Sequence, residues 1–181
     1  MSDFKTQKVL AAGFGGQGIL FAGKFLVYTG MINNREVSWL PSYGPEMRGG
    51  TANCSVIISD KPIGSPIVTD PNLLIAMNLP SLDKYEDTCQ KNAKIIIDSS
   101  LIQRKVIRDD VEGFYIPATS LAESNDLKGL ANMIIIGKAI KETGICAYSD
   151  IEKAMKKTVS ERKKALFDAN LKAVDLGYNY E

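Results

Sequence analysis

The sequence predicts an α/β protein with three α/β/α layers, in which helices cover a mostly parallel, Rossmann-like sheet. Short apolar runs of strand length alternate along the chain with longer helical stretches. A glycine-rich turn joins the first run to the first helix, in the position typical of such sheets. An antiparallel hairpin and a group of C-terminal helices complete the expected fold. The 181 residues fit a single domain, residues 1–181, with no linker or internal repeat.

The N-terminal half contributes the first strands. We expect strands over residues 8–12, 36–40 and 51–59, and an apolar helix over residues 18–29. Pro41 closes the second strand, because proline lacks the N–H that a sheet requires. After the third strand, Asp60-Lys61-Pro62 predicts a turn, so residues 63–68 are expected to return as the second arm of the antiparallel hairpin.

The C-terminal half continues the alternation and then becomes helical. Residues 73–77 and 94–98 predict central strands, with a short helix over 81–92 between them and one more strand over 113–116. From residue 127 onward three helices are expected, separated by Gly144 and by the region of Thr158. The stretch 133–140 is apolar nearly all round and should be buried. The last helix, 161–176, carries an apolar stripe of Leu166, Ala169, Ala173 and Leu176.

Composition excludes several classes of function. Lys and Arg total 22 against 21 Asp and Glu, a net charge of +1, which offers no broad field for nucleic acid or for a membrane surface. No apolar run approaches the ~20 residues that span a bilayer. Residues 1–5 lack the features of a signal peptide, so we expect a cytoplasmic protein.

The absence of histidine restricts the chemistry further. It removes Ser–His and Cys–His nucleophiles and histidine-ligated metals. Cys54, Cys89 and Cys146 form no C-x-x-C pair, and three thiolates cannot complete a four-cysteine cluster. We therefore expect buried free thiols, no metal site and no catalytic residue in this chain.

The glycine turn, Gly13-Phe14-Gly15-Gly16-Gln17-Gly18, follows a strand and opens a helix. Free N–H groups at a helix start favour an anion, and glycines allow a close backbone approach. A dinucleotide site also needs an acid at the end of the second strand, but Glu36 stands at that strand's beginning. The turn therefore packs against another subunit or contacts an anion or nucleotide group, and a full NAD site is the least favoured reading.

The segment from Pro41 to Gly50 is the second candidate for a binding site. Its arginine, Arg48, can grip a phosphate or carboxylate through two parallel hydrogen bonds, and Tyr43 offers a flat face with a polar tip. A rigid surface loop in which Glu46 and Arg48 pair with each other is the alternative.

At these two segments the sequence resembles the gamma family of 2-oxoacid:ferredoxin oxidoreductases. The resemblance rests on Gly13–Leu20, then Trp39–Cys54, Ser59–Pro66 and Ala76–Leu82. The form Trp-Leu-Pro-Ser-Tyr-Gly-Pro-Glu-Met-Arg-Gly-Gly is closer to 2-oxoglutarate or branched-chain 2-oxoacid (ketoisovalerate) enzymes than to pyruvate enzymes. A pyruvate-specific gamma subunit and an autonomous Rossmann-type oxidoreductase remain as alternatives.

The resemblance implies a reaction shared among several chains. A 2-oxoacid is decarboxylated on thiamine diphosphate, electrons pass through iron–sulfur clusters to ferredoxin, and the acyl group leaves on coenzyme A. Thiamine diphosphate, Mg and the clusters belong to partner alpha, beta and ferredoxin-like delta chains. This chain would support assembly and help to bind coenzyme A. The candidate contacts are Gly13, Gly15, Gly16, Gln17, Gly18, Tyr43, Glu46, Arg48, Gly49 and Asn53.

Overall fold

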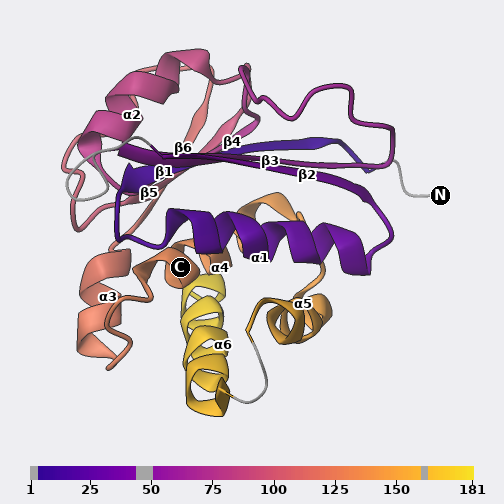
Figure 1. Cartoon of the computed structure of the whole chain (residues 1–181). Helices are drawn as coiled ribbons and strands as arrows, with labels where there is room; N and C mark the ends of the chain where they lie inside the picture. Colours follow the sequence, from indigo (N-terminus) through magenta and orange to yellow (C-terminus); the bar gives the residue numbers. More distant parts are fainter. Residues whose placement is uncertain (1–3, 44–50, 160–162) are drawn as a thin grey trace.

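The structure is a computed structural model that describes residues 4–43, 51–159 and 163–181. Within these residues one sheet holds six strands in the order β2-β3-β1-β4-β5-β6 (Figure 1). The strands are β1 (Gln7–Phe14), β2 (Glu36–Tyr43), β3 (Thr51–Ser59), β4 (Leu73–Ala76), β5 (Lys94–Asp98) and β6 (Glu112–Ile116). β3 runs antiparallel to both of its neighbours, and the pairs β1–β4, β4–β5 and β5–β6 are parallel. The predicted mostly parallel α/β sheet is confirmed.

Helices cover the two faces of the sheet unequally. The α-helices are α1 (Ile19–Ile32), α2 (Leu79–Tyr85), α3 (Ala118–Ser124), α4 (Ala131–Thr143), α5 (Ile151–Thr158) and α6 (Lys164–Tyr178), with 3₁₀ turns η1 (Glu86–Thr88) and η2 (Tyr148–Asp150). α2 lies on one face, while α1 and the C-terminal helices lie on the other (Figure 1). α5 packs on α1, and α6 packs on α4.

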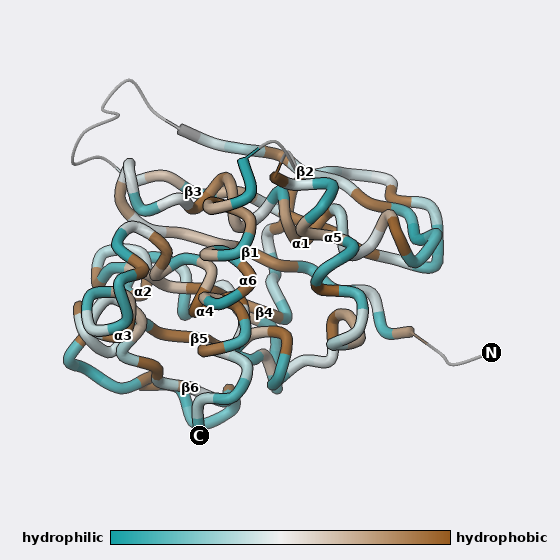
Figure 2. The backbone as a smooth tube through the Cα atoms, turned by 90° about the horizontal axis from the view of Figure 1, so that it is seen from below, coloured by the Kyte–Doolittle hydropathy of each residue, from teal (hydrophilic) through white to brown (hydrophobic). Residues whose placement is uncertain are grey.

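The core accordingly has two parts. The larger part fills the space between the sheet and the α1–α4 side, and the smaller part lies under α2. Hydrophobic residues are concentrated along central strands such as β1 and β5 (Figure 2). Residues Ile95–Ile97 of β5 are completely buried, as expected for a strand covered on both faces. Every residue of α4 from Asn132 to Ile140 is buried, which confirms the prediction for 133–140.

The predicted hairpin was placed on the wrong segment. β3 pairs back with β2, in a register from Glu36↔Ser59 to Tyr43↔Ala52, and residues 60–72, all of them described, hold no strand. The prolines at 62 and 66 cannot donate to a ladder, and the N–H of Val68 bonds to the side chain of Ser55 instead. β2 also continues through Pro41 to Tyr43, because it is an edge strand and tolerates a missing donor there.

Three helical details also differ from expectation. The helix expected over 81–92 is α2 followed by the turn η1, and α3 was not expected at all. α6 begins at Lys164, and its Leu166 is 43% exposed. Of the predicted stripe only Ala173 is buried, while Ala169 and Leu176 are half-buried.

Two glycines set the distance between α4 and α6. A Cβ atom placed on Gly137 would lie 2.0 Å from the carbonyl oxygen of Val174, and one on Gly177 would lie 1.8 Å from that of Ile134. The helices therefore touch backbone to backbone at this crossing.

In the described part of the chain, no helix is both long enough and apolar enough to cross a membrane.

Candidate functional site at the carboxyl edge of the sheet

The carboxyl edge is the edge of the sheet at which β1, β4, β5 and β6 end. Phe14, the last residue of β1, lies opposite Thr51 of β3, and Ala52 lies opposite Tyr43 of β2. Thr51 therefore lies next to the end of β1, and Tyr43 lies one strand farther from the glycine turn at the same edge. Glu46, Arg48 and Gly49 lie outside the described residues, as does the side chain of Tyr43. Asn53 is half-buried on β3, between Ala12 and Ser42.

The glycine turn has the backbone geometry that its glycines predict. Gly16 has φ +95° and Gly18 has φ +74°, both in the left-handed region that side chains disfavour. Gly13 is restricted for a different reason, since a Cβ there would lie 2.6 Å from the Gln17 amide oxygen and 2.8 Å from Ile19. The turn is thus compact under Gly13 and open at Gly16, where a Cβ would meet nothing within 4 Å.

Gln17 fixes the turn to the neighbouring strand. Its Oε1 accepts a hydrogen bond from the N–H of Phe14 at 2.6 Å, and its Nε2 donates to the carbonyl of Met77 at 3.0 Å. One amide thereby joins the ends of β1 and β4. Both functional groups of Gln17 are engaged within the protein, so the structure gives it a positioning role, and its contact with a ligand stays a prediction.

The N-terminus of α1 is open to an acceptor. Among the described residues no side chain caps α1, and its first turn contains no acid. Helix starts of this kind favour negative charge, because their first N–H groups lack intrahelical acceptors. The Nδ2 of Asn132, on α4, donates to the carbonyl of Gly18 at 3.0 Å and so holds α4 against the turn. The Oδ1 of Asn132 is buried without a partner in the described part of the chain.

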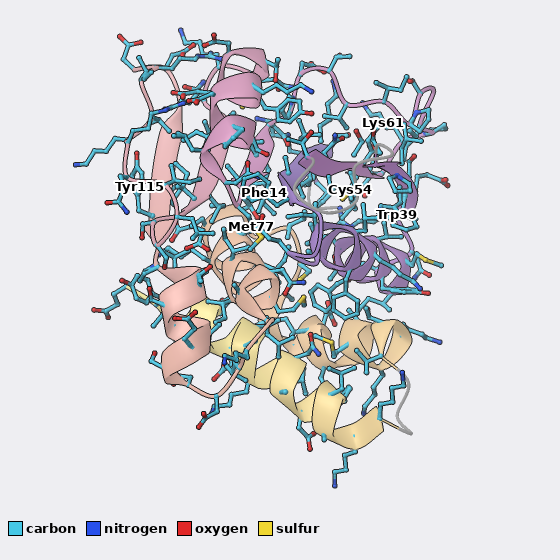
Figure 3. All side chains as sticks on the ribbon, turned by 60° about the vertical axis from the view of Figure 1, so that its left-hand side comes forward. Phe14, Trp39, Cys54, Lys61, Met77 and Tyr115 are labelled. Atoms are coloured by element: carbon cyan, nitrogen blue, oxygen red, sulfur yellow. The ribbon has the colours of Figure 1, made fainter. Side chains whose placement is uncertain are left out.

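A cavity of about 240 Å³ opens next to the turn. It is lined by Gly16, Gln17, Met77, Leu101, Thr119, Ala122, Glu123, Lys128, Gly129 and Ala131. These residues come from the turn, the end of β4, the segment after β5, helix α3 and the start of α4. Figure 3, which brings this edge forward, shows Phe14 and Met77 close to each other there. Sequence reasoning missed every residue of the cavity beyond the turn, and only its location, after the ends of parallel strands, was foreseeable.

Asp98, the last residue of β5, organises one wall of the cavity. It is fully buried and accepts hydrogen bonds from the hydroxyl of Thr119 at 2.6 Å and from the N–H groups of Ser100 and Thr119. The carboxylate therefore fastens the turn after β5 and the start of α3. Asp98 thus caps the turn that follows its own strand.

Comparison with known proteins decides the family. Residues 8–180 match the model of the pyruvate ferredoxin/flavodoxin oxidoreductase family. The chain belongs to this family. The resemblance that the glycine turn and the segment 41–50 indicated is thereby confirmed.

The relatives are similar over nearly the whole chain. The 2-oxoglutarate synthase subunit KorC of Methanocaldococcus jannaschii is 34% identical over 95% of this chain and 92% of its own length. The ketoisovalerate oxidoreductase subunit VorA of Methanothermobacter thermautotrophicus is 36% identical over 97% of this chain, which spans only 36% of that longer relative. The keto/oxoacid ferredoxin oxidoreductase gamma subunit from Geobacter sulfurreducens superposes with a TM-score of 0.83, at 26% identity, covering 97% of this chain and 95% of that one.

This member of the pyruvate ferredoxin/flavodoxin oxidoreductase family has no thiol suited to holding a cluster. All three cysteines are buried and form no disulfide bond, which confirms the expectation of buried free thiols. Burial raises the pKa of Cys54 and of Cys146 to about 12 and that of Cys89 to about 11, so the thiols stay protonated near neutral pH. No group of three or more potential metal ligands occurs among the described residues. An iron–sulfur cluster does not fit this part of the chain.

The sheet order also departs from a dinucleotide-binding Rossmann half. There the strand after the first helix lies beside the first strand, and its final acid reaches the ribose. Here β3 lies between β1 and β2. Glu36 stands at the far end of β2, opposite Ser59, seven residues before Tyr43 and thus roughly 23 Å from the carboxyl edge.

Proposed function

We propose that this chain, as a single gamma domain over residues 1–181, is the gamma subunit of a multi-subunit, thiamine diphosphate-dependent 2-oxoacid:ferredoxin oxidoreductase. The observation that carries the proposal is the family match over residues 8–180, together with a relative of nearly equal length that is named a 2-oxoglutarate synthase subunit. The names of the relatives favour 2-oxoglutarate or ketoisovalerate as the substrate. The cytoplasm is the location that this reaction implies.

The proposed reaction divides its chemistry among chains. The 2-oxoacid loses its carboxylate as CO₂, the two electrons of the broken C–C bond pass singly to oxidised ferredoxin, and the remaining acyl group forms a thioester with coenzyme A. Alpha and beta chains would hold thiamine diphosphate and Mg, and a ferredoxin-like delta chain or domain would hold the clusters. The buried, protonated thiols and the absence of histidine in this sequence support that division.

We further propose that this chain contributes to the binding of coenzyme A at the carboxyl edge. The candidate contacts are the backbone of Gly13, Gly15, Gly16 and Gly18, the Gln17 backbone, and Tyr43, Glu46, Arg48, Gly49 and Asn53. The uncapped start of α1 suits a phosphate, and Tyr43 and Thr51, the described residues that flank the segment with Arg48, lie at the same edge of the sheet. An arginine fork would supply the matching positive charge.

The alternative, an autonomous nicotinamide oxidoreductase, gains no support from the geometry. The inserted strand β3 and the distance of Glu36 from the carboxyl edge remove the ribose contact that such a site needs among the described residues.

Reconstitution tests the proposal directly. The purified chain and its separately purified thiamine-binding and ferredoxin-like partners are assayed for ferredoxin reduction that depends on a 2-oxoacid and coenzyme A. We expect no turnover by the chain alone and full activity on recombination. Turnover of a 2-oxoacid by the isolated chain, or full activity of the partners without it, would refute the proposal.

Coenzyme A binding is tested in the assembled complex by isothermal titration. Arg48→Ala should weaken binding about tenfold or more, since hydrogen bonds to charged groups contribute about 1.5–3 kcal/mol. Lys61→Ala is the matched control, because it removes a positive charge from the exposed turn after β3, at the opposite edge of the sheet. Equal affinities for both variants and the wild type would remove Arg48 from the site.

A further inference from the structure

Asn132, the second residue of α4, lies against the start of α1. Its side chain is only 3% exposed, and its Nδ2 donates to the carbonyl of Gly18 at 3.0 Å. A Cβ atom on Gly18 would lie 2.5 Å from that Nδ2, so the amide rests directly on the N-cap residue of α1. The bond to Gly18 fixes the orientation of the amide, because only its NH₂ group can donate to a carbonyl.

The other end of this amide is left unpaired. The Oδ1 of Asn132 is buried and finds no hydrogen-bond donor among the described residues, which is an unfavourable state for a polar atom. A leucine would fill a similar space, and the carbonyl of Gly18 would keep its bond from the N–H of Ala22 at 3.0 Å. The fold therefore does not depend on an amide here. The unpaired Oδ1 indicates a donor that a bound molecule supplies.

The cavity beside the glycine turn reaches both sides of this contact. Gly16 lines it from the turn, and Ala131, the neighbour of Asn132, lines it from the start of α4. Lys128 in the lining and the first N–H groups of α1 favour negative charge, whereas Glu123 in the lining can only accept hydrogen bonds. A group that suits all of these must combine an anion with a hydrogen-bond donor. The volume of about 240 Å³ is below the ~300–1,000 Å³ of sites for drug-sized ligands, so it suits one part of a cofactor.

We propose that this site takes a phosphate ester with a neighbouring hydroxyl group, and that Asn132 determines this specificity by accepting a hydrogen bond from the hydroxyl. The inference rests on the proposed function. In coenzyme A the ribose that carries the 3′-phosphate has a free 2′-hydroxyl on the adjacent carbon, whereas the diphosphate has no hydroxyl on a neighbouring carbon. The 3′-phosphate end of coenzyme A is therefore the part that binds at the start of α1.

The test measures binding to the assembled complex by isothermal titration with three probes: coenzyme A, its 2′-deoxy analogue and 3′-dephospho-coenzyme A. The wild type should bind coenzyme A about fivefold more tightly than the 2′-deoxy analogue, which corresponds to one hydrogen bond. It should bind dephospho-coenzyme A about tenfold or more weakly, since hydrogen bonds to a charged group are stronger. In Asn132→Leu the preference over the 2′-deoxy analogue should fall to about one, while the preference over dephospho-coenzyme A remains.

Asn170→Leu is the matched control, because Asn170 on α6 has the same pattern of contacts. It is 1% exposed, its Nδ2 donates to a backbone carbonyl at 2.7 Å, and its Oδ1 is buried without a partner in the described part of the chain. Gly137 lies against Val174 and Gly177 lies against Ile134, so the two helices run in opposite directions and Asn170 lies toward the far end of α4. This variant should keep both wild-type preferences.

Steady-state kinetics gives a second readout that a purely structural role would not produce. In Asn132→Leu the KM for coenzyme A should rise about fivefold, while kcat and the KM for the 2-oxoacid stay within about twofold of wild type. Thermal denaturation checks that each variant is folded, and Asn132→Ala serves if leucine disturbs the contact.

Two results would overturn the inference while activity of the reconstituted complex leaves the proposed function intact. One is an unchanged preference for coenzyme A over the 2′-deoxy analogue in a folded Asn132 variant. The other is equal affinity of the wild type for coenzyme A and dephospho-coenzyme A, which would remove the 3′-phosphate from the start of α1. Failure of the wild-type complex to bind coenzyme A or to turn over would overturn both proposals.

Discussion

The crossing of α4 and α6 predicts a large effect from the smallest side chain. In Gly137→Ala the new Cβ would lie 2.0 Å from the carbonyl oxygen of Val174 and 2.7 Å from the backbone nitrogen of Tyr178. Carbon and oxygen normally approach no closer than about 3.3 Å. Both opposing atoms are backbone, so no side-chain rotation relieves the overlap, and the helices must separate by more than about 1 Å.

The magnitude follows from two opposing contributions. Overpacking in a well-filled core costs typically about 1–3 kcal/mol, and a clash with backbone belongs at the upper end of that range. Alanine favours the helix over glycine by about 1 kcal/mol. We therefore expect a net loss of about 2 kcal/mol, which lowers the thermal midpoint of a protein of this size by about 4–8 °C.

The assay is thermal and urea denaturation of the full chain, followed by circular dichroism. Gly64→Ala is the control, because its Cβ would meet nothing within 4 Å and its φ is not positive. Gly177→Ala should resemble Gly137→Ala, and the double variant should cost less than the sum, since the helices are already apart. A Gly137→Ala midpoint equal to or above wild type would show that helix propensity decides and that the close crossing is wrong.

Other predictions concern the carboxyl edge and the segment after β5. Gln17→Ala removes the bonds to Phe14 and Met77 and should lower stability by about 1–2 kcal/mol in urea titration, whereas no loss would show that the turn is held by its glycines alone. Gly16→Ala should cost about 1 kcal/mol from its positive φ without any clash, measured in the same way against Gly64→Ala. Burial tends to raise the pKa of Glu86, but hydrogen bonds from the N–H groups of Ile107 and Arg108 and from Arg104 hold it below its usual value of 4.5. A carboxylate with a lowered folded-state pKa stabilises the fold above the unfolded pKa and loses that contribution as the pH falls through the folded pKa. Below about pH 4.5 the stability of wild type should therefore decline more steeply than that of Glu86→Gln, in which Asp70, Asp110 and Asp150, whose pKa values are also lowered, still titrate.

Elements made of continuous apolar runs were predictable from the sequence. β5 and the buried stretch of α4 each contain three consecutive isoleucines, Ile95–Ile97 and Ile134–Ile136, and such runs predict burial on their own. The glycine turn was predictable as well, because positive φ at Gly16 and Gly18 is a local requirement.

The strand that pairs with β3 was not predictable, because strand pairing depends on contacts between segments far apart in the sequence. The residues of β3 are compatible with an arm on either side, and only the sheet shows that β3 pairs with β2 and β1 and not with residues 63–68. α3 was missed because it is short and largely polar, and its position is set by contacts such as that of Asp98 with Thr119. The cavity was missed because its lining residues, such as Leu101, Ala122 and Lys128, belong to no sequence motif and are brought together only by the fold.

The placement of β3 explains why a glycine turn of the dinucleotide type persists here without the rest of such a site. β3 runs antiparallel between β1 and β2, with Ala52 opposite Gly13 on one side and Tyr43 on the other. Its backbone occupies the place beside β1 from which a neighbouring strand would present an acid to a ribose, and it moves the end of β2 about 9–10 Å from the turn. The open helix start and the close backbone approach remain, since they depend only on β1, the turn and α1. What that arrangement can still recognise is a group brought to the edge from outside, such as a phosphate or a partner's side chain, and not a dinucleotide held along the sheet.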